Sequence, residues 1–266
     1  MNIKAHLKRV VILMREFGLD PIKGINFIRG MPSYIYDYFL LKKQSLGEDF
    51  DFGNFYPCIH DKYDKSGSAM GHYFHQDLFV ARMVFKKNPS VHVDIGSRID
   101  GFVAHVASFR KIHVFDIRPL NDSNQIPNII FSQSDMMGTI NAEYYNYCDS
   151  ISCLHAIEHF GLGRYGDPIN FNGHLVGLDN IFHILKSKGK LYFSVPIGTQ
   201  RIEFNAHRVF SVDYLLRYFS ENYCLDSFSY IDDLGHMHEN ASINSDNTNS
   251  NFGCEYGCGI FELTKL

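Results

Sequence analysis

Short apolar runs alternate with amphipathic stretches from about residue 72 to the C-terminus. Apolar runs bounded by Gly, Asp or Pro predict strands, and apolar residues spaced three and four apart predict helices. The predicted strands cover residues 91–95, 112–115, 129–131, 150–154, 190–195, 225–230 and 259–264. The predicted helices cover residues 72–85, 101–109, 175–185 and 211–219, the last entered through Ser211 as N-cap.

This alternation is typical of an α/β fold in which helices cover both faces of a parallel sheet. We therefore predict a Rossmann-like, doubly wound, mostly parallel sheet. No helical pattern separates the last two strands, so we expect an antiparallel C-terminal edge strand. Residues 240–251 are rich in Asn and Ser and predict a flexible loop.

The N-terminal part follows a different pattern. Apolar residues recur there at helical spacing, and residues 46–66 are rich in Gly, Asp, Pro and aromatic side chains, which predicts irregular structure. We divide the chain into an N-terminal helical and irregular extension, residues 1–66, and a Rossmann-like domain, residues 67–266. The residues expected to interrupt the N-terminal helix are Gly24, Gly30 and Pro32.

Composition restricts the class of protein. The 266 residues are 45% hydrophobic and 20% charged, as in ordinary globular proteins. The net charge of −4 divides unevenly, with +5 on residues 1–45 and −9 on the remainder. The acidic remainder argues against nucleic-acid binding. The basic, aromatic N-terminus has two interpretations, a solvated helix face or a surface that contacts anionic lipid or an acidic partner.

The apolar runs also bear on location. None approaches the 18 residues of a transmembrane helix, and the apolar run near the N-terminus is too short for a signal peptide. We therefore expect a cytoplasmic protein, or one held peripherally at the inner face of the membrane. Six cysteines do not make a disulfide scaffold in a chain of this length. Cys254 and Cys258 lack a CxxC companion, so their spacing does not predict a structural zinc site.

Polar residues suited to ligand binding follow three of the predicted strands. In a doubly wound sheet, ligands bind at the carboxyl ends of the strands. Gly96 after the first strand allows a tight turn and a close approach of the ligand. Asp116 ends the second strand, where a carboxylate can accept both hydroxyls of a ribose, and Asp135 follows the third, where it could accept an adenine amino group. Together, these residues favour an adenosine-type pocket.

Residues 70–266 resemble the class I S-adenosylmethionine-dependent methyltransferases. Asp94-Ile95-Gly96 resembles the acid-x-Gly start of that family's first motif, Asp116 its ribose-binding acid and Asp135 its adenine-side acid. Arg98 departs from the pattern because it occupies the place of the second glycine, where it could crowd the cofactor or bind an anion. The resemblance implies S-adenosylmethionine as cofactor. The residues it places at the cofactor are Asp94, Gly96, Ser97, Arg98, Gly101, Asp116, Ile117, Asp135 and Met136.

A second resemblance covers nearly the whole chain. Residues 71–77 (GHYFHQD), 155–168 (HAIEHFGLGRYGDP) and 204–210 (FNAHRVF) resemble the family called domain of unknown function 268. Bacterial members of that family resemble enzymes of surface-polysaccharide gene clusters. The family label supplies no reaction, so the chemistry has to be argued from the residues.

The richest polar cluster follows the fourth strand. A histidine there could take a proton from a sugar hydroxyl while a carboxylate orients it. The same cluster could instead hold a divalent metal, with Asp167 or His174 completing a shell begun by His155, Glu158 and His159, or it could only shape the cleft. We assign no residue as a metal ligand. The residues predicted to be catalytic or to bind substrate are His155, Glu158, His159, Arg164, Asp167, His207 and Arg208.

The preferred hypothesis is an S-adenosylmethionine-dependent O-methyltransferase of bacterial surface-polysaccharide biosynthesis. Its substrate would be a sugar, a nucleotide-sugar or a lipid-linked glycan. One alternative keeps the fold but replaces methyl transfer with a metal-dependent or lyase-type step on a glycan. The other is a non-enzymatic binding subunit of a glycan-assembly complex. The acceptor sugar and the oligomeric state do not follow from the sequence.

Overall fold

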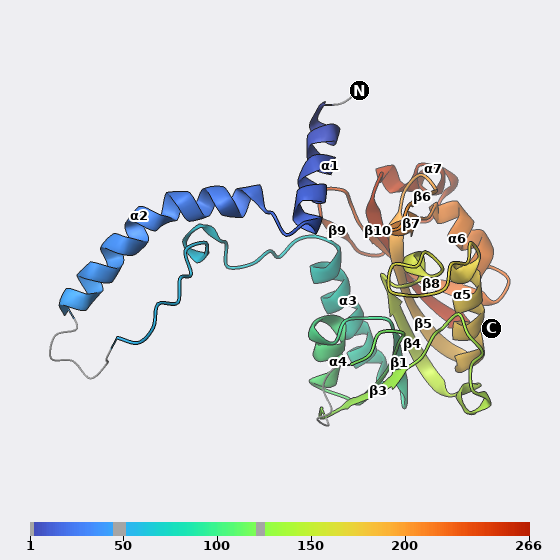
Figure 1. The fold of residues 1–266 in the computed structure, drawn as a ribbon. Coiled ribbons are helices and arrows are strands. Elements are labelled where there is room, and N and C mark those ends of the chain that lie inside the picture. The colour runs from blue at the N-terminus through green and yellow to red at the C-terminus, as the bar shows by residue number, and fades with distance from the viewer. Residues whose placement is uncertain (1–2, 45–51, 121–125) are drawn as a thin grey trace. The chain divides into compact units, whose positions relative to one another are not determined.

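The computed structural model describes residues 3–44, 52–120 and 126–266, and it divides into two compact units, residues 1–68 and residues 69–266 (Figure 1). The first unit holds helices α1 (Ile3–Glu16) and α2 (Pro21–Gln44) and the 3-10 turn η1 (Asp61–Tyr63). Of the segment predicted to be irregular, residues 46–51 lie outside the described ranges, and residues 52–66 contain only η1 as a regular element.

Helix α2 runs through the residues that were expected to interrupt it, so that prediction was wrong. Gly24, Gly30 and Pro32 all lie inside the helix. Gly30 is needed for packing, because a Cβ there would lie 2.4 Å from Cγ2 of Ile59. Pro32 removes one backbone donor, and the tertiary contact at Gly30 favours a continuous helix over this local penalty.

An eight-stranded sheet forms the centre of the second unit, in the order β3-β2-β1-β4-β5-β10-β8-β9. Strands β1 to β5 are parallel to one another, and β10 pairs antiparallel with both β5 and β8. The mostly parallel sheet with antiparallel strands at one side confirms the predicted fold class. The C-terminal strand itself is interior, between β5 and β8, and the short β9 forms that edge. The strands are β1 (His92–Ile95), β2 (Ile112–Asp116), β3 (Ile129–Gln133), β4 (Cys148–Leu154), β5 (Leu185–Ile197), β8 (Tyr223–Ile231), β9 (Met237–His238) and β10 (Gly257–Lys265).

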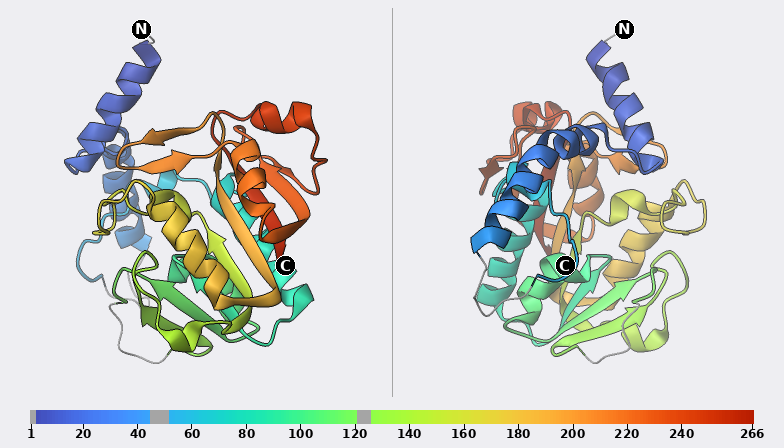
Figure 2. Two further views of the ribbon diagram at one scale, coloured as in Figure 1. Left: turned by 90° about the vertical axis from the view of Figure 1, so that its right-hand side faces the viewer. Right: turned by 60° about the vertical axis from the view of Figure 1, so that its left-hand side comes forward.

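Helices cover both faces of this sheet, as Figures 1 and 2 show. Helices α3 (His72–Lys87) and α4 (Ala104–Ala107) lie on one face, and α5 (Gly173–Ile184) and α6 (Val212–Phe219) on the other. Alternate residues of β2 therefore enter two separate apolar cores, Phe115 one of them and Ile112 and Val114 the other. This double coverage explains why the parallel strands are apolar on both sides.

The remaining elements are short. A π-helical turn η2 (Ile99–Val103) precedes α4, and the 3-10 turns η3 (Ala142–Tyr144) and η4 (Ile157–His159) flank β4. Strands β6 (Arg201–Glu203) and β7 (His207–Val209) form a separate hairpin. Helix α7 (Ser245–Asn249) and turn η5 (Asn251–Gly253) follow β9. Helix α7 lies in the segment predicted to be a flexible loop, because the Asn244 side chain caps it by accepting a hydrogen bond from the Asn247 amide at 2.9 Å.

Candidate functional site

A cavity of about 600 Å³ opens at the carboxyl ends of β1, β2, β3 and β4, the edge at which doubly wound folds bind ligands. Twelve of the sixteen residues predicted for the site line it. They are Gly96, Ser97, Arg98, Gly101, Asp116, Ile117, Asp135, Met136, His155, His159, Arg164 and Asp167.

The turn after β1 is built around a buried carboxylate. Asp94 is fully buried and accepts hydrogen bonds from the Ser97 amide at 3.0 Å, the Ser97 hydroxyl at 2.9 Å and the Ser152 hydroxyl at 2.6 Å. Burial raises the pKa of Asp94 to about 7, although these hydrogen bonds oppose the shift. Asp94 does not line the cavity, so the structure corrects its predicted role: it holds the Gly96–Ser97 turn in place.

Gly96 brings the backbone to the cavity wall. Its φ is +76°, and a Cβ there would lie 2.9 Å from the Cβ of Ala156. A side chain at this position would therefore be both strained and crowded. Arg98, two residues later, does not fill the cavity, because its side chain is 75% exposed and binds both oxygens of Asp100, at 2.9 and 2.7 Å.

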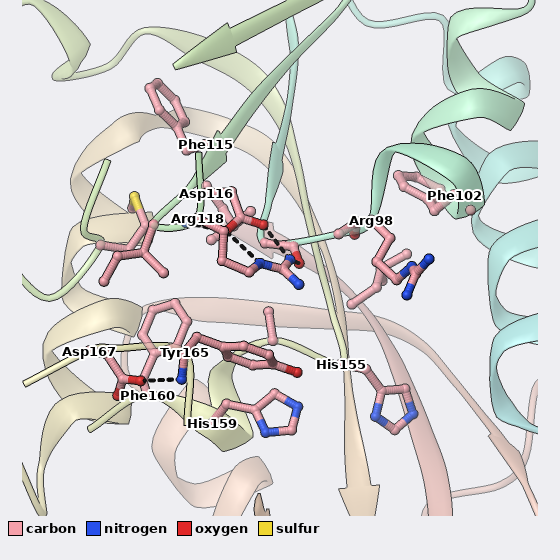
Figure 3. Close-up of a pocket in the computed structure, with 18 of the residues that line it drawn as sticks. Arg98, Phe102, Phe115, Asp116, Arg118, His155, His159, Phe160, Tyr165 and Asp167 are labelled. Atoms are coloured by element: carbon pink, nitrogen blue, oxygen red, sulfur yellow. Dashed lines mark hydrogen bonds and ion pairs between the residues drawn. The ribbon is translucent and has the colours of Figure 1, made fainter. Parts of the chain in front are cut away.

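Asp116 at the end of β2 is held by Arg118. The Asp116 carboxylate accepts hydrogen bonds from the Arg118 amide at 2.8 Å and from Nε at 2.9 Å, and it also contacts Nη2. The same Nη2 donates to the Gly96 carbonyl at 3.2 Å. Figure 3 shows the Arg118 side chain beside Asp116, and the Arg118 guanidinium also contacts the Tyr165 ring.

The floor near β3 combines apolar and polar groups. Phe115, Ile117 and Met136 line the cavity beside Asp135. The Asp135 carboxylate accepts a hydrogen bond from the Met137 amide at 2.8 Å, which leaves acceptor capacity for a ligand. This wall can hold a flat apolar ring and accept a hydrogen bond from its edge.

His155 and Glu158 form a buried pair after β4. His155 Nδ1 lies 2.8 Å from Glu158 Oε1, and both side chains are less than 5% exposed. His155 has a backbone φ of +49°, which is rare for residues other than glycine. Burial alone would lower the pKa of His155, but Cys258 and Glu158 together raise it well above the ordinary value. Burial would raise the pKa of Glu158, but His155 lowers it.

His159 is positioned differently. Its Nδ1 lies 2.6 Å from the carbonyl oxygen of Ala206, and since that carbonyl can only accept, Nδ1 carries the proton. The neutral ring therefore has its lone pair on Nε2, 3.6 Å from Glu158 Oε1. Burial lowers the pKa of His159. His159 is thus neutral near pH 7 and has the ring form of a general base.

The loop after η4 closes this side of the cavity. Asp167 accepts hydrogen bonds from the backbone amides of Gly161 at 2.8 Å, Gly163 at 3.1 Å and Tyr165 at 3.1 Å. Asp167 therefore shapes the loop, and it also lines the cavity. The Tyr165 ring has two guanidinium groups against it, with the carbon of Arg118 4.8 Å and that of Arg164 5.3 Å from its centroid.

Three residues predicted to act on substrate lie outside the cavity lining. Arg208 is buried and donates to the carbonyl oxygens of Phe160 at 2.6 Å and Phe171 at 2.9 Å. Arg208 therefore ties together the loops behind the cavity. Substrate binding had been predicted for it, but it does not line the cavity. His207 packs against Tyr256 with ring centroids 5.0 Å apart. Glu158, also outside the lining, acts through His155.

The metal set considered from the sequence is not assembled. Asp167 is occupied by backbone amides, and His174 Nε2 lies 3.3 Å from the Tyr214 hydroxyl. His155 and His159 do not share a helix face, because η4 begins only at Ile157.

Sequence reasoning missed several lining residues. Tyr73, Gln76 and Asp77 come from α3, and Arg118 and Tyr165 come from loops. The run GHYFHQD that carried the family resemblance contains the three residues of α3 and was the available signal. The position of Arg118, two residues beyond the strand-ending Asp116, was a second signal.

Comparisons with known proteins agree with this fold. A family model described as "Caenorhabditis protein of unknown function, DUF268" matches residues 106–252. Two of the three sequence runs that resembled this family lie within the match. No curated protein sequence matches the chain.

One solved methyltransferase structure, that of a Burkholderia enzyme, has a fold similar to that of this chain. The 1,6-didemethyltoxoflavin-N1-methyltransferase of Burkholderia thailandensis, with 1,6-didemethyltoxoflavin and S-adenosylhomocysteine bound, is 12% identical with a TM-score of 0.51, over 71% of this chain and 78% of that chain. The N-methyltransferase NodS of Bradyrhizobium japonicum WM9, in complex with S-adenosyl-l-homocysteine, is 12% identical with a TM-score of 0.49, over 73% of this chain and 88% of that chain.

Proposed function

The chain belongs to the family described as "Caenorhabditis protein of unknown function, DUF268", and for this member we propose that it is an S-adenosylmethionine-dependent methyltransferase. The observation that carries the proposal is the cavity at the carboxyl ends of the parallel strands. It combines a glycine turn after β1 with acids at the ends of β2 and β3. The methyltransferase fold supports this assignment.

The residues of the cavity fit the cofactor. Gly96 leaves space for the ligand where a Cβ would meet Ala156. Asp116 retains acceptor capacity for a ribose hydroxyl at Oδ2, which accepts a single hydrogen bond from Arg118, whereas Oδ1 already accepts two. Phe115 and Met136 can contact the adenine ring, and Asp135 can accept from its amino group. When bound, S-adenosylmethionine would supply an electrophilic methyl group on its sulfonium.

The methyl acceptor is inferred from His159, Arg164 and Tyr165, which line another side of the cavity. His159 has a free Nε2 lone pair and a tautomer fixed by the Ala206 carbonyl, so it can take the proton of an acceptor hydroxyl. Tyr165 and Arg164 offer a flat ring and a cation beside it. An aromatic ring next to polar side chains suits a sugar, so we assign the acceptor as a hydroxyl of a sugar or glycan. We propose surface-polysaccharide biosynthesis as the biological process in which this reaction takes place.

Cofactor binding is tested by thermal unfolding of the full chain with S-adenosylhomocysteine. A ligand that binds the native state at 100 times its Kd stabilises it by about 2.7 kcal/mol, so the unfolding temperature should rise with ligand concentration. Adenosine should give a smaller rise. An unfolding temperature that does not move with S-adenosylhomocysteine contradicts the proposal.

Acceptor class is tested by methyl transfer from labelled S-adenosylmethionine. Free sugars, nucleotide-sugars and lipid-linked glycans are offered in parallel with amine acceptors. Transfer to a sugar hydroxyl supports the assignment. Transfer only to amines would keep the methyltransferase but overturn the acceptor. Cofactor binding without transfer to any acceptor would favour the non-methylating alternative.

For the N-terminal unit, we propose peripheral contact with an anionic membrane. No helix in the described ranges is long and apolar enough to cross a bilayer. The proposal is supported by the charge of +5 on residues 1–45 and by many exposed apolar side chains on α1 and α2. These include Ile12, Leu13, Ile22, Ile25, Ile28, Ile35, Phe39 and Leu41.

A further inference from the structure

Three potential metal ligands from distant parts of the sequence meet beside the cavity. His72 begins α3, His155 follows β4, and Cys258 is the second residue of β10. One ligand atom of each lies within 4.8 Å of the other two. His155 and Cys258 are buried and His72 is partly buried. The proposed methyl transfer uses neither His72 nor Cys258.

One ring nitrogen of His155 lacks a hydrogen-bond partner. Its Nδ1 is bound to Glu158, whereas its buried Nε2 has no hydrogen-bond partner in the structure. This holds for either form of the ring, since Nε2 would be an unpaired donor if protonated and an unpaired acceptor if not. A buried polar atom without a partner destabilises the folded state. A partner for Nε2 would remove that destabilisation.

The two imidazoles and the thiol indicate which ion this cluster would bind. We propose that His72, His155 and Cys258 bind one zinc ion. Imidazole nitrogen and thiolate sulfur are typical zinc ligands, and three protein ligands that leave a fourth position open are typical of catalytic zinc. Glu158 stands where a carboxylate commonly orients a ligating histidine through its other nitrogen.

Charge also favours a divalent ion at this position. Zinc would bind Cys258 as a thiolate, and its two positive charges would balance that thiolate and the buried Glu158 carboxylate. The wall around the ligands is largely aromatic. Tyr73 lies 5.2 Å from His155, and Tyr256 lies 5.5 Å from His72, between ring centroids.

Zinc binding requires a small contraction of the cluster. Zn–N and Zn–S bonds of about 2.0–2.3 Å in a tetrahedron separate ligand atoms by roughly 3.3–3.6 Å. Two ligand atoms at the 4.8 Å limit would therefore approach each other by about 1.2–1.5 Å. The rings of His72 and His155 are stacked with centroids 5.2 Å apart, so rotation of the partly exposed His72 side chain can supply most of this change.

Zinc would lie at the edge of the cavity, because His155 also lines it. Its open position could then bind an acceptor oxygen and lower the pKa of that oxygen. Binding of the metal does not depend on methyl transfer. The zinc proposal and the proposed function can therefore succeed or fail separately.

Metal content of the purified full chain tests the proposal. The protein is dialysed against zinc, then against metal-free buffer, and zinc per chain is measured by mass spectrometry. We expect about one zinc per chain in the wild type, and loss of most of it in Cys258→Ser and in His72→Ala. Glu158→Gln should weaken zinc affinity by about 10- to 100-fold, since it removes only the orienting carboxylate.

Matched controls separate the site from general effects. Cys224→Ser and His183→Ala change an exposed cysteine and a histidine on the outer part of α5, and both should retain zinc. Cobalt in place of zinc should give a thiolate-to-cobalt absorption band that Cys258→Ser abolishes and Cys224→Ser keeps. Melting curves establish that each variant is folded, and the partly exposed His72 provides a second variant if Cys258→Ser is unstable.

Two results would overturn the proposal. One is a wild type that keeps no more zinc than background after dialysis and shows no cobalt–thiolate band. The other is zinc binding that Cys258→Ser and His72→Ala leave unchanged, which would place the metal elsewhere.

Discussion

At the scale of single residues, the two histidines after β4 have different tasks. His155 is fixed by Glu158 within a buried pair, whereas His159 is fixed by a backbone carbonyl and keeps a free Nε2. From the sequence, a histidine of this cluster was expected to be the base and a carboxylate to orient it, without a choice between His155 and His159. The geometry makes His159 the better base and His155 the residue that Glu158 orients.

Replacement of His159 tests this division. His159→Ala should lower the rate of methyl transfer by about 10²- to 10⁴-fold, the usual contribution of a general base. His174→Ala is the control, because that histidine lies outside the cavity lining. Equal losses in the two variants, matched by equal drops in melting temperature, would contradict a catalytic role for His159.

The pH dependence of turnover follows from the same residue. A general base must be unprotonated, so the rate should fall as pH drops through its pKa. Burial lowers the pKa of His159 from 6.5, so this acid limb should lie below pH 6.5. A limb above pH 7 in a kcat profile would assign the proton transfer to another group.

Asp94 predicts an effect on stability. Its pKa is about 7 in the folded chain and near 3.8 in the unfolded chain. Between these values the folded state binds the additional proton, so this residue makes the free energy of unfolding fall as pH rises from about 4 to 7. Chemical denaturation of Asp94→Asn should lack this component. A variant whose pH dependence matches the wild type would contradict the raised pKa.

At the scale of elements, the turn after β1 positions the cavity wall. Gly96→Ala should cost about 1–3 kcal/mol of stability through its φ of +76°. It should also weaken cofactor binding, since the added Cβ would push against Ala156. Gly166→Ala is the matched control, because its φ is +82° but a Cβ there meets nothing within 4 Å. Equal loss of cofactor affinity in both variants would contradict the steric explanation.

Much of the fold could be predicted because each β-α unit is a local pattern. A few neighbouring residues are enough to predict each strand, the Ser211 cap and the acids at the strand ends. The position of β10 could not be predicted this way, because the pairing of β10 with β5 and β8 joins distant segments. Gly30 inside α2 also depends on a tertiary contact, with Ile59.

The same distinction, between local sequence patterns and contacts between distant segments, applies to the residues of the candidate site. Gly96, Asp116 and Asp135 follow their strands directly, so strand prediction was enough to bring them together. The zinc ligands proposed here could not be found by spacing, because His72, His155 and Cys258 come from three elements far apart in sequence. The buried, loop-bridging position of Arg208 could not be predicted for a similar reason, since its carbonyl partners lie in two other segments.

At the scale of the whole molecule, the proposed membrane contact predicts salt-dependent binding to lipid. The full chain should sediment with vesicles of anionic lipid but not with neutral ones, and about 1 kcal/mol per basic residue near the surface should be lost at high salt. Replacing the exposed Ile25 and Ile28 by Asp should reduce binding at any salt concentration. The same changes at exposed Leu234 and Ile169 serve as controls. Equal binding to neutral vesicles would contradict the charge argument.

The central claim is that the cavity beside β1, β2 and β3 binds S-adenosylmethionine. Calorimetric titration with S-adenosylhomocysteine tests it most directly, using the wild type, Asp116→Ala, and Asp213→Ala on the outside of α6 as control. The account predicts binding by the wild type and the control, and a loss of about 1.5–3 kcal/mol in Asp116→Ala, which is roughly a 10- to 150-fold weaker affinity. No binding by the wild type, or unchanged affinity in Asp116→Ala, would contradict it.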